Sequence, residues 1–234
     1  MIEIRNLNIK LRNSNRYLIK DFNLILNNKD KAAIIGEEGN GKTTFIKALI
    51  SSKDVLNYVE IEGIINVPKN IGYLEQNLSK LWQEKELREF FLKDTLTSEE
   101  NYEIYDDYSN LSSVFNSLGL DLDLLESERK ISTFSGGEKV KFQLAKIMIK
   151  NPEFLILDEP TVGLDQENEA HVISALENLM QNRTTLMITH DLALAAKTDR
   201  ILFINNGTIE EQGNHQQLLA QGGNYANWWK LQLS

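Results

Sequence analysis

The glycine-rich stretch at residues 36–44 carries the residue types best suited to chemistry. Gly36, Gly39 and Gly41 are followed directly by Lys42 and Thr43. Glycines adopt positive φ and allow close approach, so successive backbone N–H groups can turn inward around phosphate oxygens. The lysine would contact the outer phosphates, and the threonine hydroxyl would be a ligand to Mg²⁺. The stretch therefore predicts a phosphate-binding loop (P-loop), whose other residues are Glu37, Glu38, Asn40 and Thr44.

The elements expected on either side of this loop position it. Residues 31–35 are a short apolar run typical of a buried parallel strand, and residues 45–50 read as a helix. The helix N-terminus would add unpaired N–H groups and the positive end of its dipole to the phosphate site. A glycine-rich turn that happens to precede a lysine is the alternative, but the strand–loop–helix context argues against it.

Two carboxylates follow another apolar strand. Residues 154–157 read Phe-Leu-Ile-Leu, and Asp158 and Glu159 come next. Carboxylates at the end of a buried strand are unfavourable unless a positive charge accompanies them, and Mg²⁺ on a bound phosphate would supply that charge. We therefore expect Asp158 to hold the metal, directly or through water, and Glu159 to reach a water molecule beside the outermost phosphate.

His190 follows a third predicted strand, at residues 184–189. A single histidine is more often structural than catalytic, and we interpret His171 and His215 in that way. His190 differs because it would lie at the same edge of the sheet as the P-loop. There it could form hydrogen bonds with an outer phosphate and with the attacking water.

A further helix is predicted to begin at Ser135-Gly136-Gly137-Glu138. A serine followed three residues later by glutamate is a capping-box pattern, so a capped helix without another role is the alternative. The tail from residue 214 to 233 is also predicted to be helical, and Tyr225, Trp228 and Trp229 would form one aromatic face. Docking of this face on the chain's own core is the favoured interpretation, and a partner interface is the alternative.

Composition is that of a globular chain. Hydrophobic residues make up 41% of the 234 residues and charged residues 25%, and there is no cysteine, which excludes disulfides and thiolate metal sites. No apolar run approaches the roughly 18 residues that span a bilayer, and residues 1–5 lack the apolar core of a signal peptide. The net charge of −9 argues against a nucleic-acid partner, so none is expected. We expect a soluble, cytoplasmic chain.

The order of elements predicts an α/β fold, with a P-loop NTPase parallel-sheet core, an antiparallel β-subdomain and an inserted helical subdomain. Residues 2–9 and 17–26 resemble half-buried strands, and short strands are expected in 58–67, broken at Gly63. Glycine is scarce and helical apolar spacing dominates after residue 76. We expect one domain over 1–234, with the core and β-subdomain in 1–76 and 135–234 and the helical subdomain in 77–134.

In this order, the motifs resemble those of the ATP-binding-cassette (ABC) ATPases over essentially the whole chain. A P-loop alone indicates only a nucleotide-binding protein, whereas a P-loop with a signature just upstream of a strand ending Asp-Glu-Pro is close to diagnostic. The residues that carry the resemblance are the P-loop at 36–43, Gln76 after a strand, the signature Ser135-Gly136-Gly137-Glu138, Asp158-Glu159-Pro160, Gly163-Leu164-Asp165 and His190.

The resemblance implies that two cassettes, identical or different, pair head to tail with ATP between one P-loop and the partner's signature. The two glycine-rich helix N-termini agree with this, since only one follows a lysine-bearing loop and the other is free to bind a second nucleotide's γ-phosphate. In this interpretation Glu159 is the general base, and His190 supports the γ-phosphate and the water. Gln76 senses Mg²⁺ and the water, and Asp165 contacts the opposing subunit. ATP and Mg²⁺ are the implied cofactors, with Thr43, Gln76 and Asp158 around the metal.

Two features leave alternatives open. ABC cassettes commonly place an aromatic residue before the second strand to stack on adenine, but Leu11 occupies the position that corresponds best, and Tyr17 is displaced along the chain. The residues at 130–134 lack the glutamate-and-glycine pattern of exporter cassettes, whereas the ending from Gly213 resembles that of exporters.

The favoured function is the motor subunit of an ABC transporter, which couples ATP binding and hydrolysis to transport through a separate integral membrane permease. The chain would then be peripheral on the inner face of the cell membrane. The alternative is a soluble, non-transport ABC ATPase that acts in translation, repair or cofactor assembly. Translation factors of this class resemble two cassettes with a basic linker, and repair ATPases carry coiled-coil insertions longer than residues 77–134.

Overall fold

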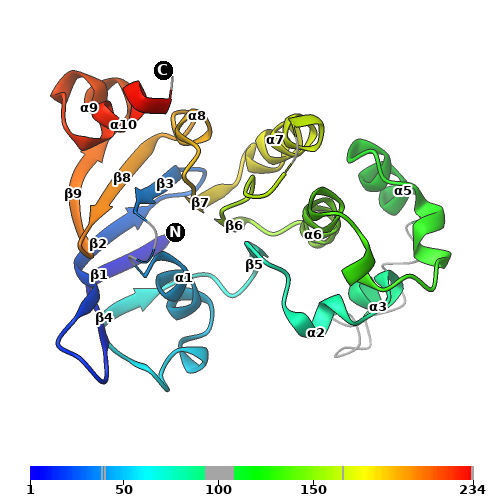
Figure 1. Cartoon of the computed structure of the whole chain (residues 1–234), viewed down its shortest axis with the longest axis horizontal. Coiled ribbons are helices and arrows are strands. Elements are labelled where there is room, and N and C mark those ends of the chain that lie inside the picture. Colours follow the sequence, from blue (N-terminus) through cyan, green and yellow to red (C-terminus); the bar gives the residue numbers. More distant parts are fainter. Residues whose placement is uncertain (38, 40, 93–107, 165, 233–234) are drawn as a thin grey trace. The chain divides into compact units, whose positions relative to one another are not determined.

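The structure is a computed structural model that describes residues 1–37, 39, 41–92, 108–164 and 166–232. The chain divides into two compact units (Figure 1). The core unit consists of Met1–Tyr73, Glu153–Glu159 and Met180–Ser234. The helical unit consists of Leu74–Pro152 and Pro160–Leu179.

A three-stranded antiparallel sheet opens the core unit. Its strands are β1 (Ile2–Leu11), β2 (Tyr17–Leu26) and β4 (Val59–Asn66), in the order β2-β1-β4. Buried and exposed positions alternate along much of β1, where Ile2 and Ile4 have no exposed surface. This alternation is the pattern of a sheet with one buried face, so the predicted β-subdomain is confirmed.

The predicted break at Gly63 is wrong, because β4 runs through this residue without interruption. Gly63 has a φ of +110°, and a Cβ atom there would lie 2.5 Å from the carbonyl oxygen of Asn6. The pairing of β1 with β4 shifts register between Arg5 and Asn8, opposite this glycine. A β-bulge in β1 therefore needs a residue without a side chain on β4, and the glycine preserves the strand.

The main sheet of the core unit has six strands in the order β5-β6-β7-β3-β8-β9. The pairs β6–β7, β7–β3 and β3–β8 are parallel, and β8–β9 is antiparallel. Because the parallel strands point the same way, the residues at their carboxyl ends share one edge, and the predicted α/β class is confirmed. The strands are β5 (Ile71–Leu74), β6 (Phe154–Asp158), β7 (Thr184–Ile188), β3 (Lys31–Gly36), β8 (Arg200–Asn205) and β9 (Thr208–Gly213).

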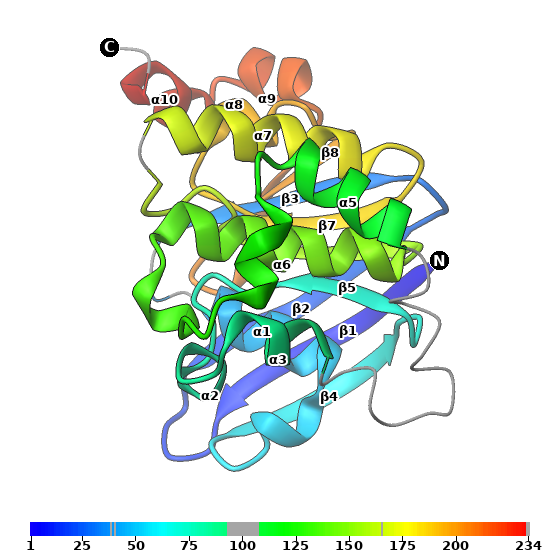
Figure 2. The same cartoon turned by 90° about the vertical axis from the view of Figure 1, so that its right-hand side faces the viewer.

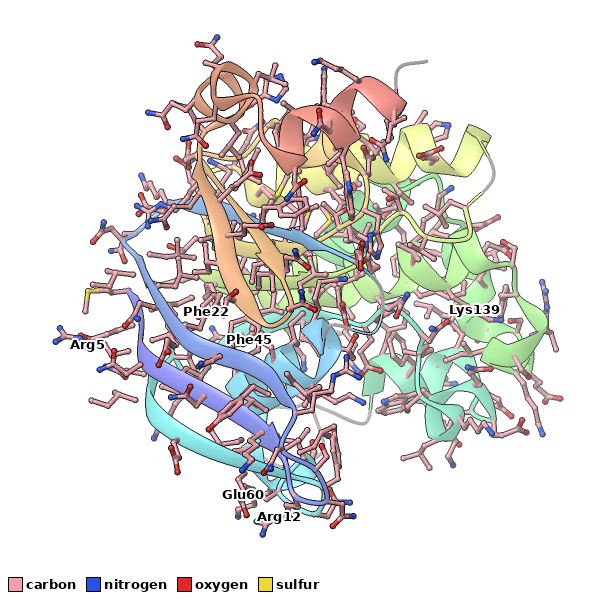
Figure 3. All side chains as sticks on the ribbon, turned by 60° about the vertical axis from the view of Figure 1, so that its left-hand side comes forward. Arg5, Arg12, Phe22, Phe45, Glu60 and Lys139 are labelled. Atoms are coloured by element: carbon pink, nitrogen blue, oxygen red, sulfur yellow. The ribbon has the colours of Figure 1, made fainter. Side chains whose placement is uncertain are left out.

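Helix α1 (Lys42–Ile50) joins the two sheets through a shared hydrophobic core. Phe45 on α1 is fully buried, and its ring centroid lies 4.8 Å from that of Phe22 on β2. Figure 3 labels these two side chains near β2 and α1, and their ring planes are tilted by 57° to each other. This packing fixes the start of α1, and with it the preceding loop, against the antiparallel sheet. A short 3₁₀ helix at Ser52–Asp54 follows α1.

The C-terminal part of the core unit is helical, as predicted. It contains α9 (His215–Gln221) and α10 (Asn224–Gln232), and α10 lies beside the short helix α8 (Leu192–Ala195) in both views (Figures 1 and 2). Tyr225 is fully buried, and the ring of Trp228 lies edge-on to Phe203 of β8, with centroids 5.1 Å apart. The aromatic face therefore docks on the chain's own core.

The helical unit packs around aromatic pairs. Phe91 lies 5.4 Å from Phe115, and Phe134 lies 4.9 Å from Phe142, between ring centroids. Within the described ranges, no helix is long and apolar enough to cross a membrane. The helices are α2 (Lys80–Gln83), α3 (Leu87–Leu92), α5 (Tyr108–Ser117), α6 (Gly136–Lys150) and α7 (Gln166–Met180), with 3₁₀ turns at Leu122–Glu126 and Ile131–Thr133.

Candidate functional site

The predicted P-loop connects β3 to α1 at the edge of the main sheet. Strand β3 ends at Gly36, and Gly41 caps α1 with a left-handed φ of 79°. A Cβ atom on Gly41 would lie 2.7 Å from the Cβ of Leu18, so both conformation and space require glycine. The described residues Glu37 and Gly39 are exposed and Thr44 is half-buried, whereas the predicted ATP-binding residues Glu38 and Asn40 lie outside the described residues.

Lys42 lies folded into this loop. Its ammonium group donates hydrogen bonds to the carbonyl oxygens of Gly36, at 2.6 Å, and Glu37, at 2.7 Å. The residue is buried, and the first turn of α1 has no acidic residue. A buried cation and the positive end of a helix dipole thus coincide, which makes the loop suited to an anion.

Asp158 ends β6 at the same edge and is almost completely buried, with 1% of its surface exposed. Neither carboxylate oxygen has a hydrogen-bond partner of normal geometry among the residues that the structure describes. Burial raises the pKa of Asp158 to about 6, and the charge of Glu159 adds to the rise, whereas the Thr43 hydroxyl, Lys42 and Lys47 oppose it. The free carboxylate is therefore in an unfavourable environment that a cation would relieve.

The side chains of Thr43 and Asp158 fit a magnesium ion. Within the described part of the chain, no three or more His, Asp or Glu residues form a cluster that could hold a metal by themselves. Mg²⁺ usually needs only one or two protein carboxylates, because waters and substrate phosphates complete its octahedron. Neither oxygen of Asp158 has a hydrogen-bond partner of normal geometry in the described part of the chain, and the Thr43 hydroxyl is close enough to lower the pKa of Asp158.

Glu159 has a strained backbone, and its carboxylate lies next to His190. It has a φ of 49°, which is uncommon for a residue other than glycine. Its Oε1 atom lies 2.8 Å from Nε2 of His190, and its Oε2 atom accepts a hydrogen bond from the His190 backbone N–H at 3.0 Å. Such strain is often found at functional sites, where the surrounding structure maintains it.

Gln76 lies in the helical unit, where its side chain is exposed. Its neighbour Glu75 is held by Gln143 of α6, which accepts a hydrogen bond from the Glu75 N–H at 2.9 Å and donates one to its carbonyl oxygen at 3.3 Å. Gln143 is buried among apolar neighbours of α6. Gln143 was not predicted from the sequence, although a glutamine on the apolar face of a predicted helix is a signal of a buried amide.

The signature also lies in the helical unit, and its capping box is confirmed. The Ser135 hydroxyl accepts a hydrogen bond from the Glu138 N–H at 3.2 Å, and the Glu138 side chain accepts one from the Ser135 N–H at 2.8 Å. Ser135 and Gly136 are exposed and Gly137 is buried. The predicted dimer-contact residue Asp165 lies outside the described residues.

A pocket lies next to the P-loop in the core unit. The Arg16 guanidinium donates a hydrogen bond to the Gly39 carbonyl oxygen at 3.1 Å, which ties the β1–β2 turn to the loop. The ammonium groups of Lys10 and Lys20 lie 5.8 and 5.9 Å from the ring centroid of Tyr17, which is 39% exposed. The pocket has a volume of about 290 Å³ and is lined by Arg16, Tyr17, Leu18, Lys20, Asn206 and Gly207.

The core unit therefore groups one set of predicted residues. Lys42, Thr43, Asp158 and Glu159 meet at one edge of the main sheet, and His190 joins them through Glu159. Arg16, Lys20 and Asn206 were not singled out from the sequence, because an exposed cation or turn residue carries no local signal of a pocket.

Comparisons with known proteins agree with these features. A family model described as "ABC transporter" matches residues 19–162. The chain is 32% identical over 223 residues to the uncharacterized ABC transporter ATP-binding protein YwjA of Bacillus subtilis, covering 92% of this chain and 39% of that protein. It is 30% identical over 234 residues to an ATP-dependent lipid A-core flippase of Pseudomonas aeruginosa, covering 96% of this chain and 38% of that protein. The chain thus spans about two fifths of the length of these relatives.

Solved structures show the same fold. A bacterial Atm1-family ABC exporter with ATP bound superposes with a TM-score of 0.78 at 23% identity, over 100% of this chain and 42% of that chain. A dimeric ATP-binding cassette bound to ADP and Pi superposes with a TM-score of 0.72 at 20% identity, over 92% of this chain and 98% of that chain. The second coverage shows that a chain of this fold can consist of little more than the region matched here.

Proposed function

The chain belongs to the ABC transporter family as an ABC ATPase domain, and from this premise we propose that it is the motor of a transporter. It binds MgATP at the P-loop, pairs head to tail with a second cassette and couples hydrolysis to transport through a membrane permease. The observation that supports this best is the set of charges at the edge of the main sheet. A buried lysine lies there together with a glutamate that accepts a hydrogen bond from the His190 N–H. Beside them is an aspartate whose oxygens have no hydrogen-bond partner of normal geometry among the described residues.

The chain's own residues divide the work at this site. The ammonium group of Lys42 and the backbone N–H groups of the loop bind the phosphates, while Thr43 and Asp158 hold the magnesium ion. When bound, Mg²⁺ supplies positive charge that offsets the charge developing on the transferred phosphoryl group. Glu159 accepts the proton of the attacking water as general base, and His190 orients Glu159 and contacts the γ-phosphate.

The base of the nucleotide is proposed to stack on Tyr17. Leu11 has no aromatic ring and packs against the hydrophobic core, whereas the Tyr17 ring lines the pocket beside the P-loop. Stacking on an aromatic ring contributes about 1–3 kcal/mol per base. We expect Tyr17→Ala to weaken ATP binding by about 5- to 100-fold and Tyr17→Phe to restore it, as measured by titration calorimetry. Equal affinity of the alanine variant and the native chain would argue against Tyr17.

The helical unit is proposed to serve the partner's nucleotide. Ser135, Gly136, Gly137 and Glu138 would contact the γ-phosphate bound to the opposing P-loop, and Asp165 would contact the opposing subunit. The exposed Gln76 would reach Mg²⁺ and the attacking water when the two cassettes close. Residues 77–134 would form the helical subdomain that contacts the permease, within a single cassette over 1–234.

Two findings support a membrane partner: the chain belongs to the ABC transporter family, and some of its relatives are named as permease proteins. One of them, at 31% identity over 239 residues, is a putative multidrug export ATP-binding/permease protein of Staphylococcus aureus, of which the chain covers 41%. We propose that the cassette lies at the inner face of the cell membrane on a separate permease. Purification from membranes in mild detergent tests this, because an associated integral membrane protein of separate mass supports it.

Two other outcomes of that purification would contradict the proposal. A single polypeptide much longer than 234 residues would place the permease in the same chain. A stable soluble complex without a membrane protein, combined with salt-sensitive micromolar affinity for RNA or DNA, would favour a non-transport ABC ATPase in translation, repair or cofactor assembly.

The hydrolytic mechanism is tested by Glu159→Gln. The variant removes the base but keeps the phosphate contacts, so ATP binding should persist while hydrolysis falls by roughly 10²–10⁴-fold. It should also trap a closed dimer, visible as an ATP-dependent shift in size-exclusion chromatography with light scattering. Glu153→Gln is the matched control, because Glu153 is exposed just before the opposite end of the same strand. Turnover of Glu159→Gln at a rate close to that of Glu153→Gln would exclude Glu159 as the base.

A further inference from the structure

Several backbone N–H groups of the loop that carries His190 donate hydrogen bonds to nearby acceptors. The Thr189 N–H donates to the Ile34 carbonyl oxygen, and the Asp191 N–H donates to the Thr189 hydroxyl. Asp191 then caps α8 by accepting a hydrogen bond from the Leu194 N–H. These partners belong to the loop itself and to the neighbouring strand β3.

One partner of this loop comes from a distant part of the chain. The side-chain amide of Gln232, at the end of α10, donates a hydrogen bond to the His190 carbonyl oxygen at 2.9 Å. Its carbonyl oxygen accepts one from the Leu192 N–H at 3.3 Å. A single amide thus bridges the backbone on both sides of Asp191, as a paired strand would.

The position of this amide is fixed by the aromatic face of α10. Tyr225 is fully buried and its hydroxyl lies 2.7 Å from Nδ1 of His215, while Trp228 packs edge-on against Phe203. The helix is therefore anchored upstream of Gln232. Figure 2 shows α10 and α8 next to each other at one end of the core unit.

From these contacts we propose that Gln232 is a positioning residue for the hydrolytic site. It fixes the backbone of His190, whose N–H donates a hydrogen bond to Oε2 of Glu159 and whose ring Nε2 lies 2.8 Å from Oε1. The C-terminal helix thereby sets the orientation of the general base. This inference rests on the proposed function, since it assigns Gln232 to the same reaction.

The matched pair Gln232→Met and Gln232→Ala separates hydrogen bonding from packing. Methionine keeps the length of the side chain but neither hydrogen bond, so both variants should lower kcat for ATP hydrolysis by about 3- to 10-fold. KM for ATP should stay within about twofold, because the contacts of the P-loop are untouched. Gln216→Met is the control, since Gln216 is exposed on α9, and its kcat should not change.

An NMR measurement tests the same contact without any turnover. The Cε1–H resonance of His190 and its backbone amide should shift in Gln232→Met, in the ligand-free protein. The resonance of His171, which is exposed on α7, should stay in place. If the native chain does not hydrolyse ATP, the proposed function fails, and the His190 resonance alone decides whether Gln232 positions that loop.

Three results would overturn the inference. An unchanged His190 resonance in Gln232→Met would show that the amide does not hold the loop. A shifted resonance with unchanged kcat would reduce Gln232 to a structural contact. A loss of kcat in Gln232→Ala that Gln232→Met fully restores would assign the effect to packing and not to the two hydrogen bonds.

Discussion

The candidate functional residues of the two units differ in burial, hydrogen bonding and backbone strain. In the core unit, Asp158 is buried without a hydrogen-bond partner among the described residues, and Glu159 has a strained backbone. In the helical unit, Ser135 and Glu138 satisfy each other in a complete capping box, at the surface. The residues of the first site therefore destabilise the ligand-free fold. The capping box of the second site stabilises its own helix whether or not a ligand is bound.

The difference is consistent with two kinds of task. A site that must bind a metal-bound nucleotide tightly and act on it benefits from groups that are preorganised for charges not yet present. A helix N-terminus that meets the nucleotide of another subunit must keep its shape while that subunit is absent. Substitutions in the two units should therefore change binding and stability in different directions.

The largest effect is expected for Lys42→Ala in the core unit. Lysine contributes charged hydrogen bonds to the bound phosphates, so ATP affinity should fall by about 100-fold, which corresponds to about 2.7 kcal/mol. Lys53→Ala is the control, because Lys53 is exposed on the 3₁₀ turn that follows α1 and lies outside the P-loop. Titration calorimetry with MgATP measures both. Equal affinities of the two variants would remove Lys42 from the phosphate site and weaken the contrast between the units.

A gain in stability is expected for Asp158→Asn in the ligand-free protein. The folded-state pKa of about 6 lies above the ordinary value of 3.8, so the folded state holds this proton more tightly than the unfolded state. The stability that results is fully present below pH 4 and is lost as the pH rises through 6. Asparagine carries no charge, so at pH 8 the variant should be more stable by about 1–2 kcal/mol.

Urea denaturation at pH 4.5 and pH 8 measures this difference. The advantage of Asp158→Asn should shrink at the lower pH, while Asp54→Asn, at an exposed 3₁₀ turn, should behave like the native chain at both. Saturating MgATP should make the native chain more stable than Asp158→Asn at pH 8, because the nucleotide stabilises only the protein that keeps the metal-binding carboxylate. A destabilised Asp158→Asn protein at pH 8 would contradict the view of the core site as unfavourable without its ligand.

The smallest effect, of opposite sign, is expected for Ser135→Ala in the helical unit. Removal of an N-cap side chain costs about 1 kcal/mol, because the Glu138 N–H loses its acceptor. Ser132→Ala, at an exposed position just upstream, should leave the free energy of unfolding unchanged. Both are measured by urea denaturation. A stabilising Ser135→Ala would show that the signature, like Asp158, is kept at a cost to the ligand-free fold.

Much of this organisation could be predicted from the sequence, because it depends on neighbours along the chain. The P-loop between a strand and a helix, the capping box at Ser135 and the aromatic face of α10 all follow from local spacing. The break at Gly63 was mispredicted, since the bulge that requires this glycine lies on another strand.

The hydrogen bonds that hold the backbone of the site could not be predicted either, because their partners lie far apart in the sequence. Gln143 binds a residue 68 positions away, and Gln232 binds one 42 positions away. Gln143 lies on the apolar face of a predicted helix, which signals a buried amide but does not identify its partner. Gln232 lies near the end of a predicted helix, which is an ordinary place for glutamine. Only the tertiary fold shows that both amides hold backbone beside a candidate catalytic residue.

The anchoring of α10 has a practical consequence. Two of the chain's three tryptophans, Trp228 and Trp229, lie on this short helix, and the third, Trp82, is in the helical unit. Replacing Trp82 with phenylalanine would confine indole emission to the segment that ends in Gln232. The protein would then report loosening of its own C-terminal helix during a turnover cycle by intrinsic fluorescence, without an attached dye.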